Sequence, residues 1–303
     1  MCPPFWVRSG GGKVEPVRRP KPSAVQRGCM FNQGVQPMFR PVDPRSNRLL
    51  AALIDAGCCR TTHPEPVSWR VGQSLCEPGG TQSHVYFPSD TVVSLQHMLD
   101  SGASSEFAVV GNEGMVGVSL LLGGTSMPSR AAVQSAGHGF QIGAQAIRDE
   151  FERPGPVRHL LLRYMQVLLT QASQSAVCNR YHVIEQQLCR FLLERLDRLP
   201  TNDLVMTQEQ MAHLLGVRRE SVTQAAARLQ EAGLVRYGRG HMAVLDRKAL
   251  ERRSCECYAA VKREHNRLLP EPCATQLEPR PAAQPQMEGR SLASCLPERV
   301  SAA

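Results

Sequence analysis

The sequence predicts an α+β fold: an N-terminal antiparallel β-roll of jelly-roll type, a long helix suited to dimerisation, and a C-terminal winged helix-turn-helix. Three observations support this prediction. Short runs between residues 69 and 150 alternate apolar with polar residues, an apolar repeat of helical spacing starts at Val157, and residues 206–245 combine two short amphipathic helices with a hairpin. A chain of 303 residues has room for about two domains.

The first helix of the C-terminal pair is predicted to begin after Thr207. Thr207 and Gln210 have the T-x-x-Q spacing of a capping box, in which each side chain bonds the other residue's backbone N–H. Gly216 stands where a helix needs a left-handed residue to end, and Val217 follows it into the corner before the next helix. The turn between the two helices is therefore predicted to be tight.

The second helix is predicted from Arg219 to Glu231, with one apolar and one polar face. The apolar positions are Val222, Ala225, Ala226 and Leu229. The polar face carries side chains that can read base edges in the major groove: Arg219 can bond guanine, Glu220 the cytosine amino group, and Gln224 adenine. We predict that these three residues read bases.

A two-stranded wing is predicted to follow this helix, with Gly238-Arg239-Gly240 as its turn. Arg236 and Arg239 would lie where a wing touches the DNA backbone, and Arg218 and Ser221 flank the base-reading residues. These four residues are the predicted phosphate contacts. The alternative is a helical hairpin with a solvated charged face.

The N-terminal half of the sequence has a pattern of short β-strands. Its β-prone runs are VYFPSDTVVSLQHML, EFAVVGNEGMVGVSLLL, SRAAVQSAG and HGFQIGA, which turn-forming Gly, Pro, Ser and Asn residues separate. One helix is predicted before them, over residues 47–56, and another begins at 147–151. This pattern is typical of a small antiparallel β-roll.

From Val157 onward a long helix is predicted, with a heptad-like seam for pairing with a second copy. The seam residues are Leu161, Met165, Leu168, Ala172 and Ser175. A second stripe of Leu160, Tyr164 and Val167 is predicted to face the β-roll. The alternative is an amphipathic helix buried within its own chain. A connecting helix that ends near Pro200 is predicted to lead into the helix-turn-helix; its apolar face holds Ile184, Leu188, Phe191, Leu192 and Leu196.

The charge of the chain is uneven. Residues 1–50 hold nine basic and two acidic residues, a net charge of +7 out of the chain's +8. We expect the Gly- and Pro-rich residues 1–45 to be a disordered tail, or alternatively a nonspecific DNA arm, and residues 263–303 to form a second disordered tail. The segment lacks a secretory signal and no apolar run is long enough to span a membrane, so a cytoplasmic protein is predicted.

The order of these elements resembles the Crp/Fnr family of bacterial transcription regulators over residues 46–262. The most specific likeness is VRRESVTQAAARLQEAGLV, which is similar to the family's recognition-helix pattern and assigns base contacts to Arg219 and Glu220. Gln224 replaces the second arginine of many relatives, and Arg218 stands at their Ser or Thr helix cap. The resemblance implies a β-roll sensor at 46–155, dimerisation and connecting helices at 156–199, and a DNA reader at 200–262.

The sensor half departs from the cyclic-nucleotide binders of this family. Those proteins carry a glutamate for the ribose and an Arg-Ser/Thr-Ala cassette for the phosphate, whereas here Val118 takes the glutamate's place and Arg130 is displaced by one position. We therefore expect that the roll does not bind cyclic AMP in the usual way. Arg130 remains a weak candidate for a phosphate ligand, and the effector is unknown.

The chain has eleven cysteines, an odd number that in a cytoplasmic protein indicates reduced thiols. The family's N-terminal iron–sulfur trio is absent. Cys255 and Cys257, with His265 downstream, do not make a four-ligand site, so no metal and no cofactor are predicted. Cys178 is a redox candidate if dimer symmetry brings it near its twin, or otherwise a small buried residue.

The sequence thus predicts a homodimeric transcription regulator that binds palindromic double-stranded DNA, with RNA polymerase as a partner implied by the resemblance. No catalytic residues are predicted. Two alternatives remain: a metal-dependent cupin-like enzyme, for which the scattered His84, His97 and His138 would have to converge, and an interaction scaffold that does not bind DNA.

Overall fold

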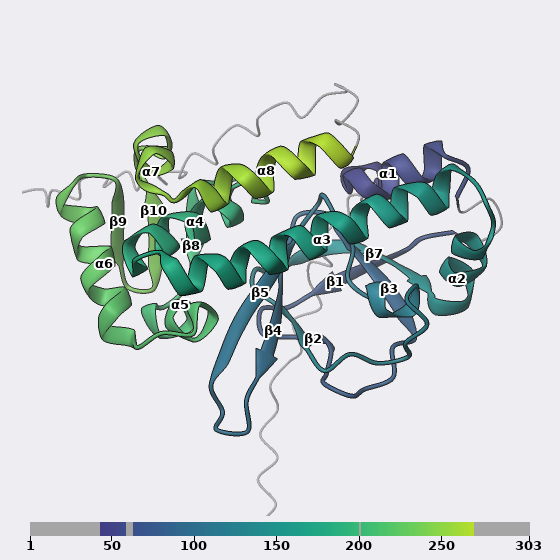
Figure 1. Ribbon diagram of the computed structural model, residues 1–303, viewed down its shortest axis with the longest axis horizontal. Helices are drawn as coiled ribbons and strands as arrows, with labels where there is room; N and C mark the ends of the chain where they lie inside the picture. Colours follow the sequence, from purple (N-terminus) through teal and green to yellow (C-terminus); the bar gives the residue numbers. More distant parts are fainter. Residues whose placement is uncertain (1–42, 59–62, 200, 270–303) are drawn as a thin grey trace, which may run out of the picture. The chain divides into compact units, whose positions relative to one another are not determined.

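The computed structural model describes residues 43–58, 63–199 and 201–269 (Figure 1). The predicted α+β class and its order of elements are confirmed. The predicted tail up to residue 42 lies outside the described residues. No helix in these described ranges is long and apolar enough to cross a lipid bilayer.

The β-roll consists of two antiparallel sheets. One has the order β1-β7-β3 and the other the order β2-β6-β4-β5. Their strands are β1 (Glu65–Trp69), β2 (Ser74–Cys76), β3 (His84–Pro88), β4 (Val93–Met98), β5 (Ser104–Val110), β6 (Arg130–Val133) and β7 (Gly137–Gly143). The predicted β-prone runs supply β3 to β7, whereas the sequence analysis missed β1 and β2.

Short helices close the roll. They are the 3-10 turn η1 (Pro44–Ser46), α1 (Arg48–Asp55), η2 (Val118–Leu120) and α2 (Ala144–Glu152). Asn47 fixes the start of α1, because its side-chain oxygen accepts from Leu50 N and its amide donates to the carbonyls of Pro88 and Gly114. This buried asparagine therefore ties α1 to the loops of the roll.

The long helix α3 (Pro156–Tyr181) crosses the roll, and α4 (Ile184–Leu196) follows it after a short break (Figure 1). Tyr164 and Val167, from the stripe predicted to face the roll, are buried, and Leu160 packs against the same apolar core. Tyr164 also donates a hydrogen bond of 2.7 Å to the carbonyl of Met115. That stripe does face the roll, as predicted.

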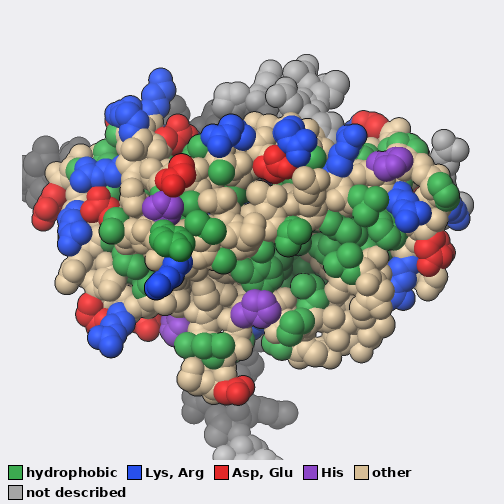
Figure 2. Space-filling model, viewed as in Figure 1, with side chains coloured by type: hydrophobic (Ala, Val, Ile, Leu, Met, Phe, Trp, Pro, Cys, Tyr) green, Lys and Arg blue, Asp and Glu red, His purple; other side chains and the backbone are tan. Residues whose placement is uncertain are grey.

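Two of the five predicted seam residues are wrong, because the chain itself buries them. Leu161 is 0 % exposed in the core of the roll, and Ser175, 4 % exposed, accepts a hydrogen bond from Arg190. The free face of α3 lies one residue over, where Leu162 is 43 % and Leu169 is 70 % exposed. Figure 2 shows hydrophobic side chains gathered over α3.

We define the revised seam as the positions on this free face that keep the spacing of three and four residues. They are Leu162, Met165, Leu169, Ala172 and Ala176. Met165 and Ala172 are shared with the predicted seam. The prediction was off by one residue because α3 carries apolar side chains on more than one face, and periodicity alone does not say which face meets the roll.

The C-terminal part contains β8 (Asp203–Val205), α5 (Gln208–Leu215), α6 (Arg219–Glu231), β9 (Val235–Gly238) and β10 (His241–Val244). The strands form a sheet of order β8-β10-β9, of which the sequence analysis missed β8. One apolar core joins α4 to this unit.

Two further helices follow the wing: α7 (Arg247–Arg253) and α8 (Glu256–Leu268), which runs back beside α3 (Figure 1). The predicted boundary between residues 262 and 263 is therefore wrong, since it cuts α8. Helical signals were present, because Asp246 caps α7 by accepting from Ala249 N, and Tyr258, Val261 and Leu268 share a buried face. The remainder of the predicted tail lies outside the described residues.

Candidate nucleic-acid interface

The first helix of the interface has the local structure that the sequence predicts. Thr207 Oγ1 accepts from Gln210 N at 3.2 Å, and Gln210 Oε1 accepts from Thr207 N at 2.8 Å, which completes the capping box. Gly216 ends the helix with φ +67°. A side chain there would meet Ser105 of β5, so glycine suits both the conformation and the space.

The second helix, α6, buries one face and exposes the other. The four residues predicted to face inward, Val222, Ala225, Ala226 and Leu229, are at most 2 % exposed. Arg219, Glu220 and Gln224 are all exposed on the opposite face, as is Arg218 at the start of the helix, while Ser221 is partly exposed. The three predicted base-reading side chains therefore share one solvent-facing surface.

Contacts between α5 and α6 hold this surface in place. Thr223 Oγ1 donates to Gln208 Oε1 at 2.7 Å. Arg219 Nε lies 3.8 Å from Glu209 Oε2, and these side chains are 64 % and 56 % exposed. Such an exposed pair contributes little free energy in water. The guanidinium of Arg219 is thus held weakly and can exchange Glu209 for a nucleic-acid acceptor.

The wing places a positive charge at its tip. His241 pairs with Gly238, so Arg239 and Gly240 form a two-residue hairpin loop, with φ +51° and +80°. Left-handed angles at both positions suit a type I′ turn, which favours Asn or Gly. Arg239 accepts a conformation that costs an L-residue about 1–2 kcal/mol. Arg236 lies on β9, also exposed.

In the roll, Val118 and Arg130 stand at the two positions where the sequence differs from the cyclic-nucleotide binders. Val118 is 5 % exposed within η2. Arg130 begins β6, and its Nε lies 3.5 Å from Glu77 Oε1. His84, His97 and His138 do not converge: His84 contacts Ser83, His97 packs on Phe107, and His138 contacts Asp90.

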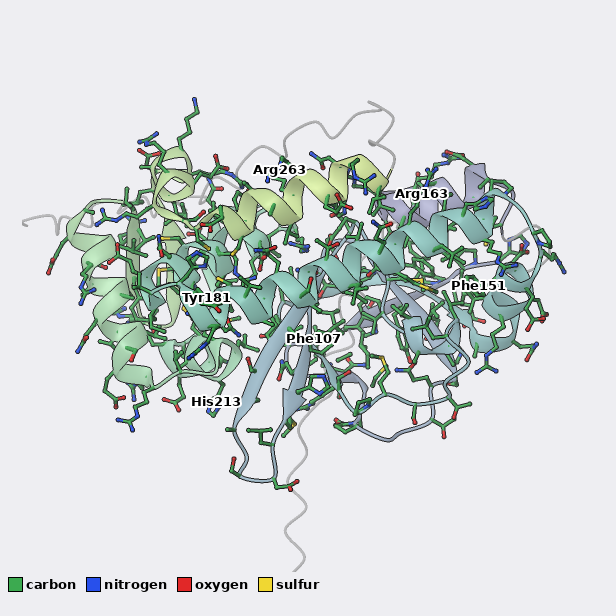
Figure 3. All side chains as sticks on the ribbon, in the orientation of Figure 1. Phe107, Phe151, Arg163, Tyr181, His213 and Arg263 are labelled. Atoms are coloured by element: carbon green, nitrogen blue, oxygen red, sulfur yellow. The ribbon has the colours of Figure 1, made fainter. Side chains whose placement is uncertain are left out.

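Buried ion pairs join α4 to the roll. Arg195 Nη2 donates to Glu106 Oε2 of β5 at 2.6 Å, and Arg198 Nε donates to Glu113 Oε1 at the same distance. The guanidinium of Arg195 stacks on Phe191, 3.4 Å from the ring centre, and burial lowers its pKa. The connecting helix is thus bonded to the sensor domain, and Ser104 of β5 also donates to the carbonyl of His213 on α5. Figure 3 labels Phe107 of β5 just below α3, and His213 of α5 lower and to the left.

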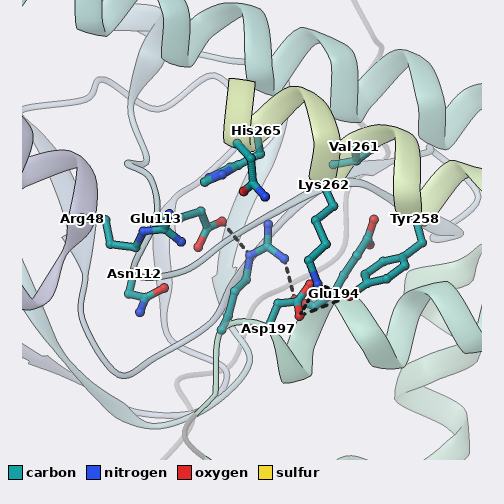
Figure 4. Close-up of a pocket in the computed structure, with 11 residues that line it drawn as sticks. Arg48, Asn112, Glu113, Glu194, Asp197, Tyr258, Val261, Lys262 and His265 are labelled. Carbon is teal, nitrogen blue, oxygen red and sulfur yellow. Dashed lines mark hydrogen bonds and ion pairs between the residues drawn. The ribbon is translucent and has the colours of Figure 1, made fainter. Parts of the chain in front are cut away.

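A polar pocket of about 160 Å³ lies between the roll, α4 and α8. Tyr258 donates to Asp197 at 3.0 Å, and Lys262 lies 3.7 Å from the same carboxylate; Figure 4 shows these three side chains together. Its charged lining residues are Arg48, Arg198, Lys262, Glu113, Glu194 and Asp197. The three positive and three negative side chains offset one another, so the pocket does not favour a cationic ligand over an anionic one. Burial lowers the pKa of His265, which also lines it.

Cys178, Cys255 and Cys257 have other neighbours than the sequence analysis expected. Cys178 is 0 % exposed and its Sγ lies 3.5 Å from Cys255 Sγ of the same chain, so it does not reach a twin across a dimer. Cys257 approaches His182, while His265 lines the pocket. The hydrogen bond from Cys178 lowers the pKa of Cys255 to about 5 and raises the pKa of Cys178 itself. The sequence analysis missed His182, which lies one helical turn beyond Cys178.

Comparison with known proteins shows which family of DNA-binding domains this part of the chain resembles. Residues 186–253 match the model of the Crp-like helix-turn-helix domain. No curated protein matches the chain in sequence. Among solved structures, FixK2 from Bradyrhizobium japonicum is similar with a TM-score of 0.56 and 17 % identity, over 64 % of this chain and 98 % of that one.

Two further structures agree. A putative transcriptional regulator of the Crp/Fnr family from Eubacterium rectale has a TM-score of 0.54 and 18 % identity, over 72 % of this chain and 97 % of its own. A regulator of the same family from Thermus thermophilus has a TM-score of 0.52 and 22 % identity, over 63 % and 98 %. Residues 186–253 are therefore a Crp-like helix-turn-helix domain, and the chain has the fold of the Crp/Fnr regulators.

Proposed function

We propose that this chain is a sequence-specific DNA-binding transcription regulator that acts as a homodimer on palindromic sites. The observation that carries the proposal is the surface of α6, where Arg219, Glu220 and Gln224 are exposed together beside a wing with Arg236 and Arg239. Arg218 and Ser221 would contact phosphates next to them. Arginine, glutamate and glutamine can each pair with a different base edge, and the wing charges can hold the phosphate backbone.

The free face of α3 supports the dimer. The revised seam leaves Leu162 and Leu169 in solvent, and an exposed apolar stripe on a long helix is stabilised by pairing with its own copy. Two α6 helices related by a twofold axis would then enter successive major grooves about 34 Å apart. RNA polymerase is the partner that this class of regulator would recruit, and the cytoplasm is where both would meet.

We further propose that the roll senses a signal other than a cyclic nucleotide bound in the usual way. Val118 offers no carboxylate to a ribose, and Glu77 competes for Arg130. Arg130 stays a weak phosphate candidate. A change in the roll would reach the DNA reader through α4, because the buried pairs of Arg195 and Arg198 join the two.

Selection from random double-stranded DNA with the full-length protein tests the proposed function. We expect enrichment of a palindrome with half-sites one helical turn apart. Arg219→Ala is expected to weaken binding to that site by about 1–3 kcal/mol and to relax the preference at one base pair of each half-site. The salt concentration must be fixed, because phosphate contacts make the affinity salt-dependent.

Arg153→Ala is the matched control, because it removes an equally exposed charge from the roll and should leave binding unchanged. If the folded protein enriches no sequence, or if Arg219→Ala binds the selected site as tightly as the unchanged chain, the reading surface is wrong. An interaction scaffold would give that result.

The wing makes a separate prediction. Arg239→Gly removes the charge at the tip while keeping a residue that favours φ +51°. We expect equal or slightly higher stability, weaker binding to every DNA sequence alike, and a salt slope lower by about 1. Fluorescence anisotropy at several salt concentrations measures this, and an unchanged slope would remove Arg239 from the interface.

A further inference from the structure

Four side chains that bind soft metals converge where α3 ends and α8 begins. They are Cys178, His182, Cys255 and Cys257, and their ligand atoms all lie within 4.8 Å of one another. Cys178 lies in the last turn of α3, and His182, four residues on, is the C-cap whose backbone N–H donates to the carbonyl of Cys178, so the two residues lie one turn apart. Cys255 is the N-cap of α8, and Cys257 is the second residue of that helix. Neither pair alone would hold an ion.

We propose that these four residues form a structural site for one tetrahedral Zn²⁺ ion. Zn²⁺ binds thiolate sulfur at about 2.3 Å and imidazole nitrogen at about 2.0 Å, so the ligand atoms of a tetrahedral site stand about 3.5–3.8 Å apart. Here Cys178 Sγ is 3.5 Å from Cys255 Sγ, and Cys257 Sγ is 3.5 Å from His182 Nδ1. An iron–sulfur cluster spreads its ligands over two or more iron atoms, so the four ligand atoms could not all lie within 4.8 Å of one another as they do here.

The surrounding residues orient the ligands as a metal site requires. His182 turns Nδ1 toward the cysteines, while its Nε2 lies 3.2 Å from Glu256 Oε2. A carboxylate on the outer nitrogen of a histidine fixes the ring and strengthens it as a ligand. Gln174 Nε2 also donates to Cys257 Sγ at 3.1 Å, a bond that favours a thiolate there.

Burial and charge agree with a bound cation. The three cysteines are at most 4 % exposed and form a small cluster of their own. Three thiolates and Zn²⁺ carry a net charge of −1, and the buried guanidinium of Arg190, which also pairs with Glu194, is the cation near them. The plain alternative, three small apolar residues packed together, does not require a histidine with its nitrogen aimed at sulfur or a glutamine that donates to one.

The position of the site indicates that the ion would join the two ends of the DNA-binding domain. The family model covers residues 186–253, so all four ligands lie just outside the helix-turn-helix domain, on both sides of it. The ion would close a loop between residues 178 and 255 that contains the whole DNA reader, and would fasten α8 to α3. Metal binding does not depend on the proposed function, whereas an effect of the metal on DNA affinity rests on it.

The metal content of the full-length protein tests the site. Protein purified with Zn²⁺ and analysed by mass spectrometry is expected to hold one zinc ion per chain. Co²⁺ in its place should give the charge-transfer and strong visible bands of a tetrahedral thiolate site. Cys255→Ser and Cys257→Ser are expected to abolish stoichiometric binding, whereas Cys76→Ser, which changes a buried cysteine in the roll, should keep it.

Two more variants separate loss of the site from loss of the fold. His182→Cys offers a fourth thiolate, so it should keep the metal with stronger charge-transfer absorption, while His182→Ala should not. Glu256→Gln leaves all four ligands and should weaken metal affinity about 10–100-fold. The proposal is wrong if Cys255→Ser and Cys257→Ser retain Co²⁺, if the protein carries iron and labile sulfide, or if Cys178 and Cys255 are found as a disulfide.

DNA binding provides the functional readout. Chelation of the ion is expected to free α8 and the DNA reader from the end of α3, and so to weaken binding to the selected palindrome at least tenfold. Zn²⁺ should restore the affinity. If the metal binds as described but the palindrome is bound equally well without it, the site stands and its coupling to DNA is rejected.

Discussion

Glu106→Gln is expected to lower the free energy of unfolding by about 3–5 kcal/mol, because it leaves the charge of Arg195 buried without its counter-ion. Arg195 is 0 % exposed and Glu106 only 8 %, and their atoms are 2.6 Å apart. Removing one partner of such a pair costs far more than the pair contributes, since the other charge cannot return to water. Urea titration followed by circular dichroism measures the change.

Two comparisons make this result specific. Asp55→Asn alters an ion pair of similar length whose side chains are more than half exposed, so it should cost less than about 1 kcal/mol. The double change Glu106→Leu with Arg195→Met replaces both charges by apolar groups, and should recover most of the loss. If Glu106→Gln costs no more than Asp55→Asn, the pair is not buried in solution.

The same pair bears on the proposed coupling between the roll and the DNA reader. Glu106 lies at a bulge in β5, because Leu95 pairs with Ala108 and Gln96 with Glu106. A bulge bends its strand and redirects the side chains beside it. A movement of the β4–β5 hairpin would therefore act directly on α4 and on the start of the helix-turn-helix.

The helix-turn-helix could be predicted almost residue by residue because its signals are local. The capping box at Thr207 and the left-handed glycine at 216 each act within one helical turn, and the structure has both. The short strands β1 and β2 could not be predicted in the same way. They are five and three residues long, and their pairing with β7 and β6 depends on residues 55 to 76 positions away.

The cysteine cluster exceeds what a single sequence can show. Cys178 and Cys255 are separated by 77 positions, and no spacing rule connects them. Sequence reasoning considered His265, which follows Cys257 in the chain, and predicted no metal site; in the structure α8 carries His265 two turns away along the helix. Only the return of α8 along α3 identifies His182 as the fourth group.

The dimer seam shows a similar limit, and it gives the second large prediction. Leu169→Glu is expected to convert the proposed dimer into monomers, because Leu169 is at the centre of the revised seam and 70 % exposed in the single chain. A twofold interface loses the contact twice. Removing two buried leucines costs about 3–6 kcal/mol, roughly a hundredfold or more in the dimer dissociation constant.

Sedimentation velocity measures the oligomeric state, and the selected palindrome measures the consequence. A monomer holds one half-site only, so its affinity for the full site should fall by a similar factor. Leu122→Glu is the matched control, since this leucine is 72 % exposed on the roll and lies outside α3. A dimer that survives Leu169→Glu but not Leu122→Glu would move the interface from α3 to the roll. Because Leu162 and Leu169 share one face seven residues apart, Leu162→Glu should give the same result as Leu169→Glu if α3 pairs with its own copy.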